Sequence, residues 1–175
     1  GGAWSADSKM ITYHHRVSGS NWDIFVYSVD TGQSSNITRD EFFDADPSFS
    51  SDGKQIVFVS NRDGNDEIYS VNVDGSNLKR LTFDPRIDSH PAFSPDGTQI
   101  LLTSNRENEN ADVYVINADG SNPQKVTNWD KTNETAVRGG WSPDGTKIAF
   151  TSTRNGNAEI YVMNANGTAQ TRLTN

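Results

Sequence analysis

Hydrophobic and polar residues alternate along most of the chain, in short stretches bounded by turns rich in glycine, asparagine and aspartate. Alternation with a period of two is typical of β-strands, and no segment keeps a helical period over ten residues. Where the pattern is clearest it predicts four short strands, at residues 47–50, 55–60, 67–73 and 79–83. The sequence therefore predicts an all-β protein.

The four-strand pattern is repeated along the chain. One aromatic residue recurs in each copy, at Trp4, Phe49, Phe93 and Trp141. The intervals are 45, 44 and 48 residues, so the 175 residues hold four copies. Four antiparallel strands repeated at this interval are typical of the blades of a β-propeller, whereas a β-solenoid would need a shorter and more regular repeat. We expect one propeller region with four blades, at about residues 1–40, 41–84, 85–128 and 129–175.

The motif "SPDGT" at residues 94–98 is expected to form the first hairpin turn of its blade. The fixed φ of Pro95 suits the second position of a type I turn, and Gly97 can adopt a positive φ. The glycine is therefore expected to serve the turn and not to bind phosphate. The first copy departs from the motif, because Ser8 stands where the other copies have glycine.

These residues carry a family resemblance. The segment "DADPSFSSDGKQIVFVSNRDGNDEIYSVNVDGSNLKRLT" at residues 44–82 resembles the TolB-type propeller repeat, a WD-like repeat with Pro-Asp in its turn. The resemblance covers the whole chain, most strongly copies two to four. It implies a TolB-like protein or a fragment of one, in the periplasm or otherwise outside the cytoplasm; TolB itself works in the envelope-spanning Tol-Pal system. Because a fold alone does not fix a function, the partner stays undetermined.

The sequence does not determine how a propeller with four blades is completed, since propellers similar to TolB have six to eight blades. The chain begins "GGAW", without an initiating methionine, so we expect that something upstream has been removed. Three alternatives follow: part of a longer propeller, a four-bladed ring closed on itself, or two chains that pair into eight blades. An open arc would expose apolar sheet faces, through which self-association is then expected.

Composition excludes several classes of protein. The net charge of −8 argues against nucleic acid as a partner, because phosphate backbones are bound by basic surfaces. A mean hydropathy of −0.71 and the short apolar stretches argue against insertion into a membrane. The absence of cysteine excludes disulfides and thiolate metal sites.

The sequence contains no catalytic motif of the serine-hydrolase, Walker, zinc-protease or cysteine-nucleophile kind. Its three histidines, His14, His15 and His90, fall in two different blades, and a metal site would need them to converge with carboxylates. We therefore expect a non-enzymatic protein with no cofactor and no bound metal. The alternative is the propeller of an enzyme, because similar repeats form the gating domain of prolyl-oligopeptidase-like peptidases and the body of oligogalacturonate lyases.

The loops at one end of the expected propeller carry the whole net charge. These are the connections between blades and those between second and third strands. We also expect Arg62, Arg106 and Arg154 to pair with the acid that begins the third strand of the same blade. A one-sided negative field steers cationic partners, so we expect a protein or peptide partner, cationic in character.

The candidate partner-binding residues lie where the copies differ. His90, before Pro91, is expected at the rim of the central channel, with Asp46 and Gly139 as its counterparts. A long loop at residues 128–140 adds an aromatic and a basic residue, types that are favoured as interface anchors. The predicted site comprises Asp44, Asp46, Asp88, His90, Trp129 and Arg138.

Overall fold

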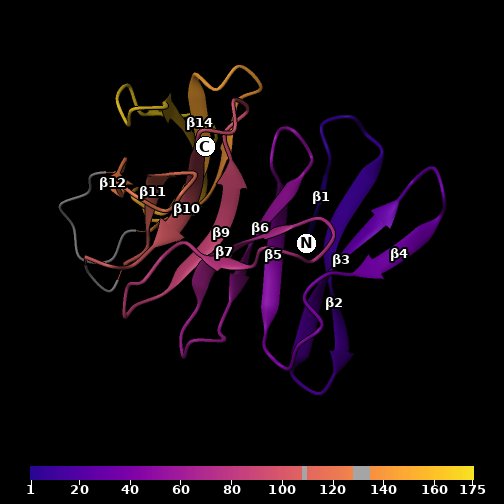
Figure 1. Ribbon diagram of the computed structural model, residues 1–175. Coiled ribbons are helices and arrows are strands. Elements are labelled where there is room, and N and C mark those ends of the chain that lie inside the picture. Colours follow the sequence, from indigo (N-terminus) through magenta and orange to yellow (C-terminus); the bar gives the residue numbers. More distant parts are fainter. Residues whose placement is uncertain (108–109, 128–134) are drawn as a thin grey trace.

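The computed structural model describes residues 1–107, 110–127 and 135–175, and these form sixteen strands in four antiparallel sheets (Figure 1). The first sheet holds β1 (Gly2–Trp4), β2 (Met10–Ser18), β3 (Asn21–Ser28) and β4 (Gln33–Asn36). The second holds β5 (Asp44–Phe49), β6 (Gln55–Ser60), β7 (Glu67–Asn72) and β8 (Lys79–Arg80). The third holds β9 (Asp88–Phe93), β10 (Gln99–Ser104), β11 (Asp112–Asn117) and β12 (Gln124–Lys125). The fourth holds β13 (Ala136–Trp141), β14 (Lys147–Ser152), β15 (Glu159–Asn164) and β16 (Thr171–Arg172).

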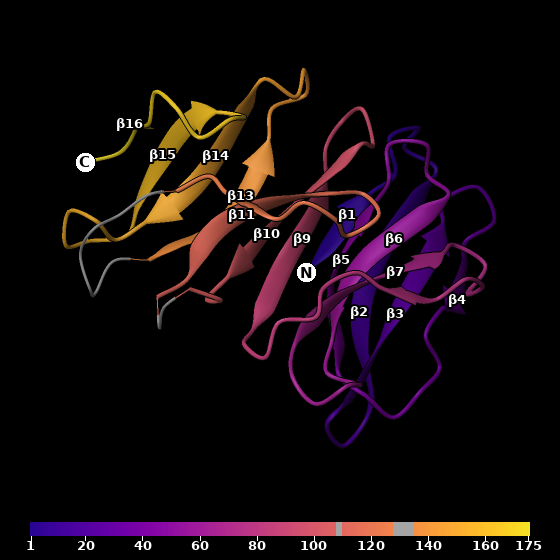
Figure 2. The same cartoon turned by 60° about the vertical axis from the view of Figure 1, so that its left-hand side comes forward.

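The sheets follow one another in chain order (Figure 2). Within each sheet the strands keep their sequence order, and the first strands of successive sheets, β1, β5, β9 and β13, pack beside one another. This arrangement confirms the prediction of an all-β propeller with four blades. Among the described residues, no helix is long and apolar enough to cross a membrane.

Alternation along each strand builds a hydrophobic core between every two neighbouring sheets. In β6, Ile56 and Phe58 pack toward the first sheet, whereas Val57 and Val59 pack toward the third. Both faces of the second and third sheets are therefore buried, and burying such side chains is the dominant favourable contribution to folding.

The hairpin turns form as the sequence predicts. The amide of Gly97 donates to the carbonyl of Ser94 at 2.9 Å, and Gly97 has a φ of 72°. Ser8 takes the same place in the first blade with a φ of 60°, so that blade keeps the turn without glycine. In the second blade, β6 has the predicted bounds, but β5 begins three residues earlier than predicted and β8 is shorter, because the outer strand pairs over two residues only.

The blades form an open arc. Ile160 on β15 is 41% exposed, whereas its counterpart on β7, Ile68, is fully buried against the third sheet. Leu173 likewise is exposed where Leu81 is buried. Among the described residues the first and fourth sheets share no packed interface. The alternative of a four-bladed ring closed on itself is therefore wrong for this structure.

Candidate partner-binding site at the propeller axis

A bulge interrupts the inner strand of each of the last three blades at the same place. The ladder between the first two strands shifts register after Ala45, after Ser89 and after Val137. The residue that follows in each strand has a left-handed backbone, with φ of 50° at Asp46, 52° at His90 and 54° at Arg138. For a residue with a side chain, this conformation costs about 1–2 kcal/mol.

Local sequence explains the bulges. Pro47 and Pro91 have no amide hydrogen to donate to the ladder, and a proline disfavours right-handed helical geometry in the residue before it. In the fourth blade Gly139 takes this place, where a β-carbon would lie 2.6 Å from Cδ2 of Leu101. A side chain at this position would therefore press on Leu101 of the neighbouring blade, which glycine avoids.

The register corrects one expectation. Val137 pairs with Thr151 and Gly140 with Ala149, so Arg138, and not Gly139, is the counterpart of Asp46 and His90. The alignment on the aromatic positions gives the same answer, because Asp46, His90 and Arg138 each lie three residues before the aromatic residue of their blade; the expectation named the residue one place too far along. An acid, an imidazole and a guanidinium therefore occupy equivalent places in successive blades.

Hydrogen bonds from the preceding blade hold two of these backbones. The amide of Asp46 donates to Nδ1 of His14 at 3.0 Å, and the amide of Arg138 donates to Oγ1 of Thr103 at 3.2 Å. His14 and Thr103 occupy the same place on the second strand of their blades. The first and third blades thus each position the bulge of the blade that follows.

The three side chains come together at one open pocket of about 250 Å³. Its walls include Pro47, Pro91 and Gly139, as well as the charged or titratable side chains of Asp46, His90 and Arg138. The pocket is polar at these three points and otherwise lined by prolines, glycines and an alanine.

Asp46 lies between two histidines. Its Oδ2 is 3.5 Å from Nε2 of His90, and its Oδ1 is 3.9 Å from Nδ1 of His14. Burial lowers the pKa of His90 below the usual 6.5; Asp46 opposes this shift and Arg138 adds to it. Burial is also the main cause that lowers the pKa of His14. Both imidazoles are therefore mainly neutral at pH 7, which leaves the Asp46 carboxylate and the Arg138 guanidinium as the charged groups.

The structure places the other predicted residues elsewhere. Asp44 and Asp88 have no exposed surface, and they form ion pairs with Arg62 and Arg106 at 3.1 and 2.8 Å. In this structure they support the inner strands and do not line the pocket. Trp129 lies outside the described residues.

The expected pairing of arginines with third-strand acids is wrong for Arg62 and Arg106, which bind the inner-strand acids instead. The third-strand acids pair with the fourth strand of the same blade, as Glu67 does with Arg80. Register explains this, because Arg80 lies opposite Tyr69, diagonally next to Glu67 on one face of the sheet. Sequence reasoning missed the fourth-strand cations because only the strand register brings them to these acids.

The same pairs weaken the predicted negative field. Three acids of this end, Glu67, Asp112 and Glu159, are neutralised by cations that belong to outer strands. Their partners are Arg80, Lys125 and Arg172. Part of the negative charge is therefore compensated locally, and the axial pocket itself carries one carboxylate and one guanidinium.

The four-stranded antiparallel sheets follow one another around their first strands, and a pocket lies at the inner edge that they share. This arrangement defines a β-propeller. The chain belongs to the TolB beta propeller domain family, whose model matches residues 1–139 and 85–175 and so covers its whole length. No curated protein matches the chain in sequence.

Solved structures show the same fold. TolB from Acinetobacter baumannii is 28% identical with a TM-score of 0.86, over 99% of this chain and 42% of that protein. A putative TolB from Agrobacterium tumefaciens is 22% identical with a TM-score of 0.85, over 98% of this chain and 63% of that one. An oligogalacturonate lyase from Vibrio parahaemolyticus is 19% identical with a TM-score of 0.72, over 98% and 52%. The chain thus spans less than two thirds of the length of these proteins, and the likeness to the lyase is one of fold alone.

Proposed function

We propose that the protein is a non-enzymatic binding module that holds a protein or peptide partner at the axial pocket formed by Asp46, His90 and Arg138. Membership of the TolB propeller family supports a protein partner and a location outside the cytoplasm, in the periplasm of a bacterium.

One observation carries the proposal: three different charged or titratable side chains occupy equivalent left-handed positions around one pocket. Glycine is the residue that adopts this backbone at least cost, and the propeller turns use it for that purpose. Side chains kept at such positions at a cost in stability are typical of functional sites. Fold requirements explain the bulge, but they do not explain an acid, an imidazole and a guanidinium there.

The chemistry of the pocket indicates how a peptide would bind. The Asp46 carboxylate would accept hydrogen bonds from a cationic side chain, and the Arg138 guanidinium would donate to a carbonyl or carboxylate of the same segment. Between them, Pro47 and Pro91 offer apolar walls that accommodate an aliphatic stem. A peptide with a lysine or arginine next to an apolar residue fits this arrangement.

A screen of displayed peptides against the purified protein tests the proposal. For a selected peptide, calorimetry should show that Asp46→Asn and Arg138→Asn each weaken binding at least about tenfold, the equivalent of 1.4 kcal/mol. Asparagine tolerates the left-handed backbone, so both variants should fold normally.

Asp30→Asn is the matched control, because Asp30 is an exposed acid in the hairpin turn at the other end of the first blade. It should leave the dissociation constant unchanged. Selected peptides that bind both pocket variants as tightly as the unaltered protein would overturn the assignment of this pocket.

A further inference from the structure

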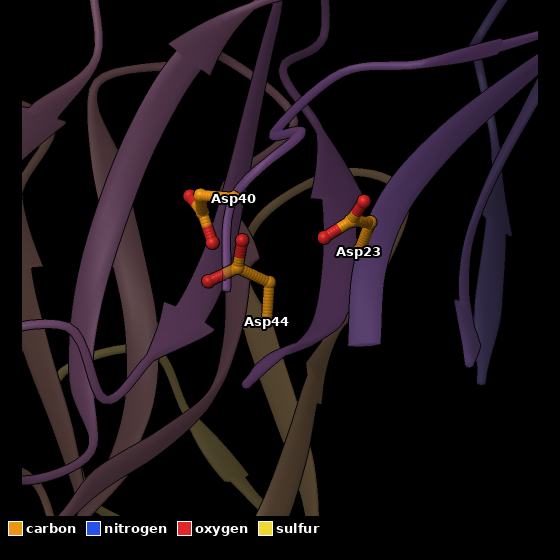
Figure 3. Close-up of side chains that lie close together, drawn as sticks. All are labelled: Asp23, Asp40 and Asp44. Atoms are coloured by element: carbon orange, nitrogen blue, oxygen red, sulfur yellow. The ribbon is translucent and has the colours of Figure 1, made fainter. Parts of the chain in front are cut away.

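Three carboxylates meet at the junction between the first and second blades (Figure 3), and none of them lines the axial pocket. Asp23 begins the buried part of β3, Asp40 lies in the connection between the blades, and Asp44 begins β5. One oxygen from each lies within 4.8 Å of the other two. Asp23 is 2% exposed and Asp44 is fully buried.

One cation lies against two of the three acids. Nη2 of Arg62 donates to Oδ2 of Asp40 at 2.8 Å and to Oδ1 of Asp44 at 3.1 Å. Asp23 receives a hydrogen bond at Oδ2 from the side-chain amide of Asn36, whereas its Oδ1 is buried and has no partner among the described residues. A buried carboxylate oxygen without a partner is costly, so this atom needs an explanation.

The other three blades provide the comparison. In the second blade, the acid at this position, Glu67, pairs with Arg80 and accepts a hydrogen bond from the hydroxyl of Thr82. The third and fourth blades repeat this pattern of one cation and one threonine at the third-strand acid. Their sets are Asp112 with Lys125 and Thr127, and Glu159 with Arg172 and Thr174.

The first blade lacks the cation. Asn36 lies opposite Phe25 as Arg80 lies opposite Tyr69, so an asparagine occupies the place of the arginine. The hydroxyl of Thr38, the counterpart of Thr82, accepts a hydrogen bond from the amide of Ile24, and among the described residues it is not hydrogen-bonded to Asp23. Three acids with one arginine leave a formal charge of −2 at the junction when all are ionised.

A second buried acceptor lies on the same strand. Oδ1 of Asn21 has no partner among the described residues, while its amide nitrogen donates to the carbonyl of Asp40. Residues two apart on a strand share a face, so Asn21 and Asp23 present oxygens on the same side of β3.

From this geometry we propose that a calcium ion binds at the junction of the first and second blades, through carboxylate oxygens of Asp23, Asp40 and Asp44 and the amide oxygen of Asn21. All donors are hard oxygens, which suit calcium and magnesium and not the softer metals. Magnesium demands near-octahedral geometry and keeps several waters, whereas calcium accepts irregular sets of oxygens. Calcium is therefore the better match for donors from a strand and an irregular loop with little exposed surface. The ion neutralises the third-strand acid of the first blade, as Arg80, Lys125 and Arg172 do in the other blades.

Calcium chloride added to chelator-treated protein tests the proposal, with magnesium chloride as the comparison. Calorimetry should show one calcium bound per chain, and a hundredfold excess over the dissociation constant should raise Tm by about 5–10 °C. Magnesium should produce a smaller rise.

The decisive variant is Asn36→Arg, which gives the first blade the cation of the other three. We expect it to reduce calcium affinity at least tenfold and to raise the Tm of the metal-free protein. Gln33→Arg adds the same charge at the other end of β4 and should bind calcium as the unaltered protein does. Asp23→Asn should also lose calcium binding. If this variant fails to fold, the calcium affinity of Asn36→Arg still tests the proposal.

Absence of a calcium signal in the folded protein, an equal response to magnesium, or unchanged calcium affinity in Asn36→Arg would each overturn the proposal. None of the proposed ligands lines the axial pocket, so this result is independent of peptide binding there.

Discussion

The Asp46 carboxylate and the His90 imidazole come from adjacent blades, and their Oδ2 and Nε2 atoms lie 3.5 Å apart at the axial pocket. Both residues have the same left-handed backbone conformation, and each lies at the bulge of its own strand. The relationship brings two residues 44 positions apart in the sequence to one pocket.

The burial of His90 predicts how stability depends on pH. Burial lowers the pKa of folded His90 below the value near 6.5 of the unfolded chain. The unfolded chain therefore binds more protons as the pH falls through 6.5, so stability is present above this pH and is lost on acidification. Chemical denaturation should show that the free energy of unfolding falls less between pH 7.5 and pH 5.5 for His90→Asn than for the unaltered protein. His15→Asn, at an exposed histidine on β2, should keep the original dependence; identical curves for all three proteins would contradict the prediction.

The Arg106–Asp88 pair predicts a strong energetic coupling. Arg106→Met leaves the buried Asp88 carboxylate without its cation, which should lower the free energy of unfolding by about 3–5 kcal/mol. Addition of Asp88→Asn should recover part of this loss. A double-mutant cycle should give a coupling of about 1–3 kcal/mol for Arg106 with Asp88, and below about 0.5 kcal/mol for Arg106 with Asp112. A larger coupling energy with Asp112 than with Asp88 would contradict this prediction and support the pairing of Arg106 with the third-strand acid that the sequence predicted.

Gly120 should tolerate alanine poorly. Both Gly120 and Gly64 have a positive φ, but only at Gly120 would a β-carbon overlap the carbonyl oxygen of Leu81 in the preceding blade. We expect Gly64→Ala to cost about 1–2 kcal/mol through backbone strain alone, and Gly120→Ala to cost about 1–3 kcal/mol more. Urea denaturation of the two variants measures the difference, and equal losses would show that the blades adjust without strain.

The open face of the fourth sheet predicts an asymmetry between equivalent isoleucines. Ile68→Ala should cost about 2–5 kcal/mol because it leaves a cavity in a packed interface. Ile160→Ala should cost less than about 1 kcal/mol, because its side chain is 41% exposed. Denaturation, with molar mass measured by light scattering, checks both. An equal loss at Ile160 would mean that a second copy or a further blade covers this face in solution.

Much of the fold could be predicted from the sequence because its causes are local. The continuous apolar run within residues 55–60 determines a strand with both faces buried, and Pro95 with Gly97 determines the turn that precedes such a strand. Repetition of this unit every 44 to 48 residues then determines blades, because no sheet of this kind can bury its faces alone.

Less of the candidate sites could be predicted. The difference between Asp46, His90 and Arg138 was visible in the aligned copies, since each lies three residues before the aromatic position, although Gly139 was named in place of Arg138. The left-handed backbone at these residues leaves no clear mark in the sequence. Asp44 and Asp88 were expected to face a partner, and they lie buried instead, because an acid near a loop can point either outward or to an arginine.

The sequence by itself therefore determined the strands, the turns, the repeat and the family, all of which depend on neighbours in the chain. Only the tertiary structure decided which acid pairs with which arginine, that Asp46 meets His14 and His90, and that Asp23 lacks the cation present in every other blade. These relationships depend on strand register and on contacts between blades, where a change of one residue moves a side chain to the opposite face of the sheet.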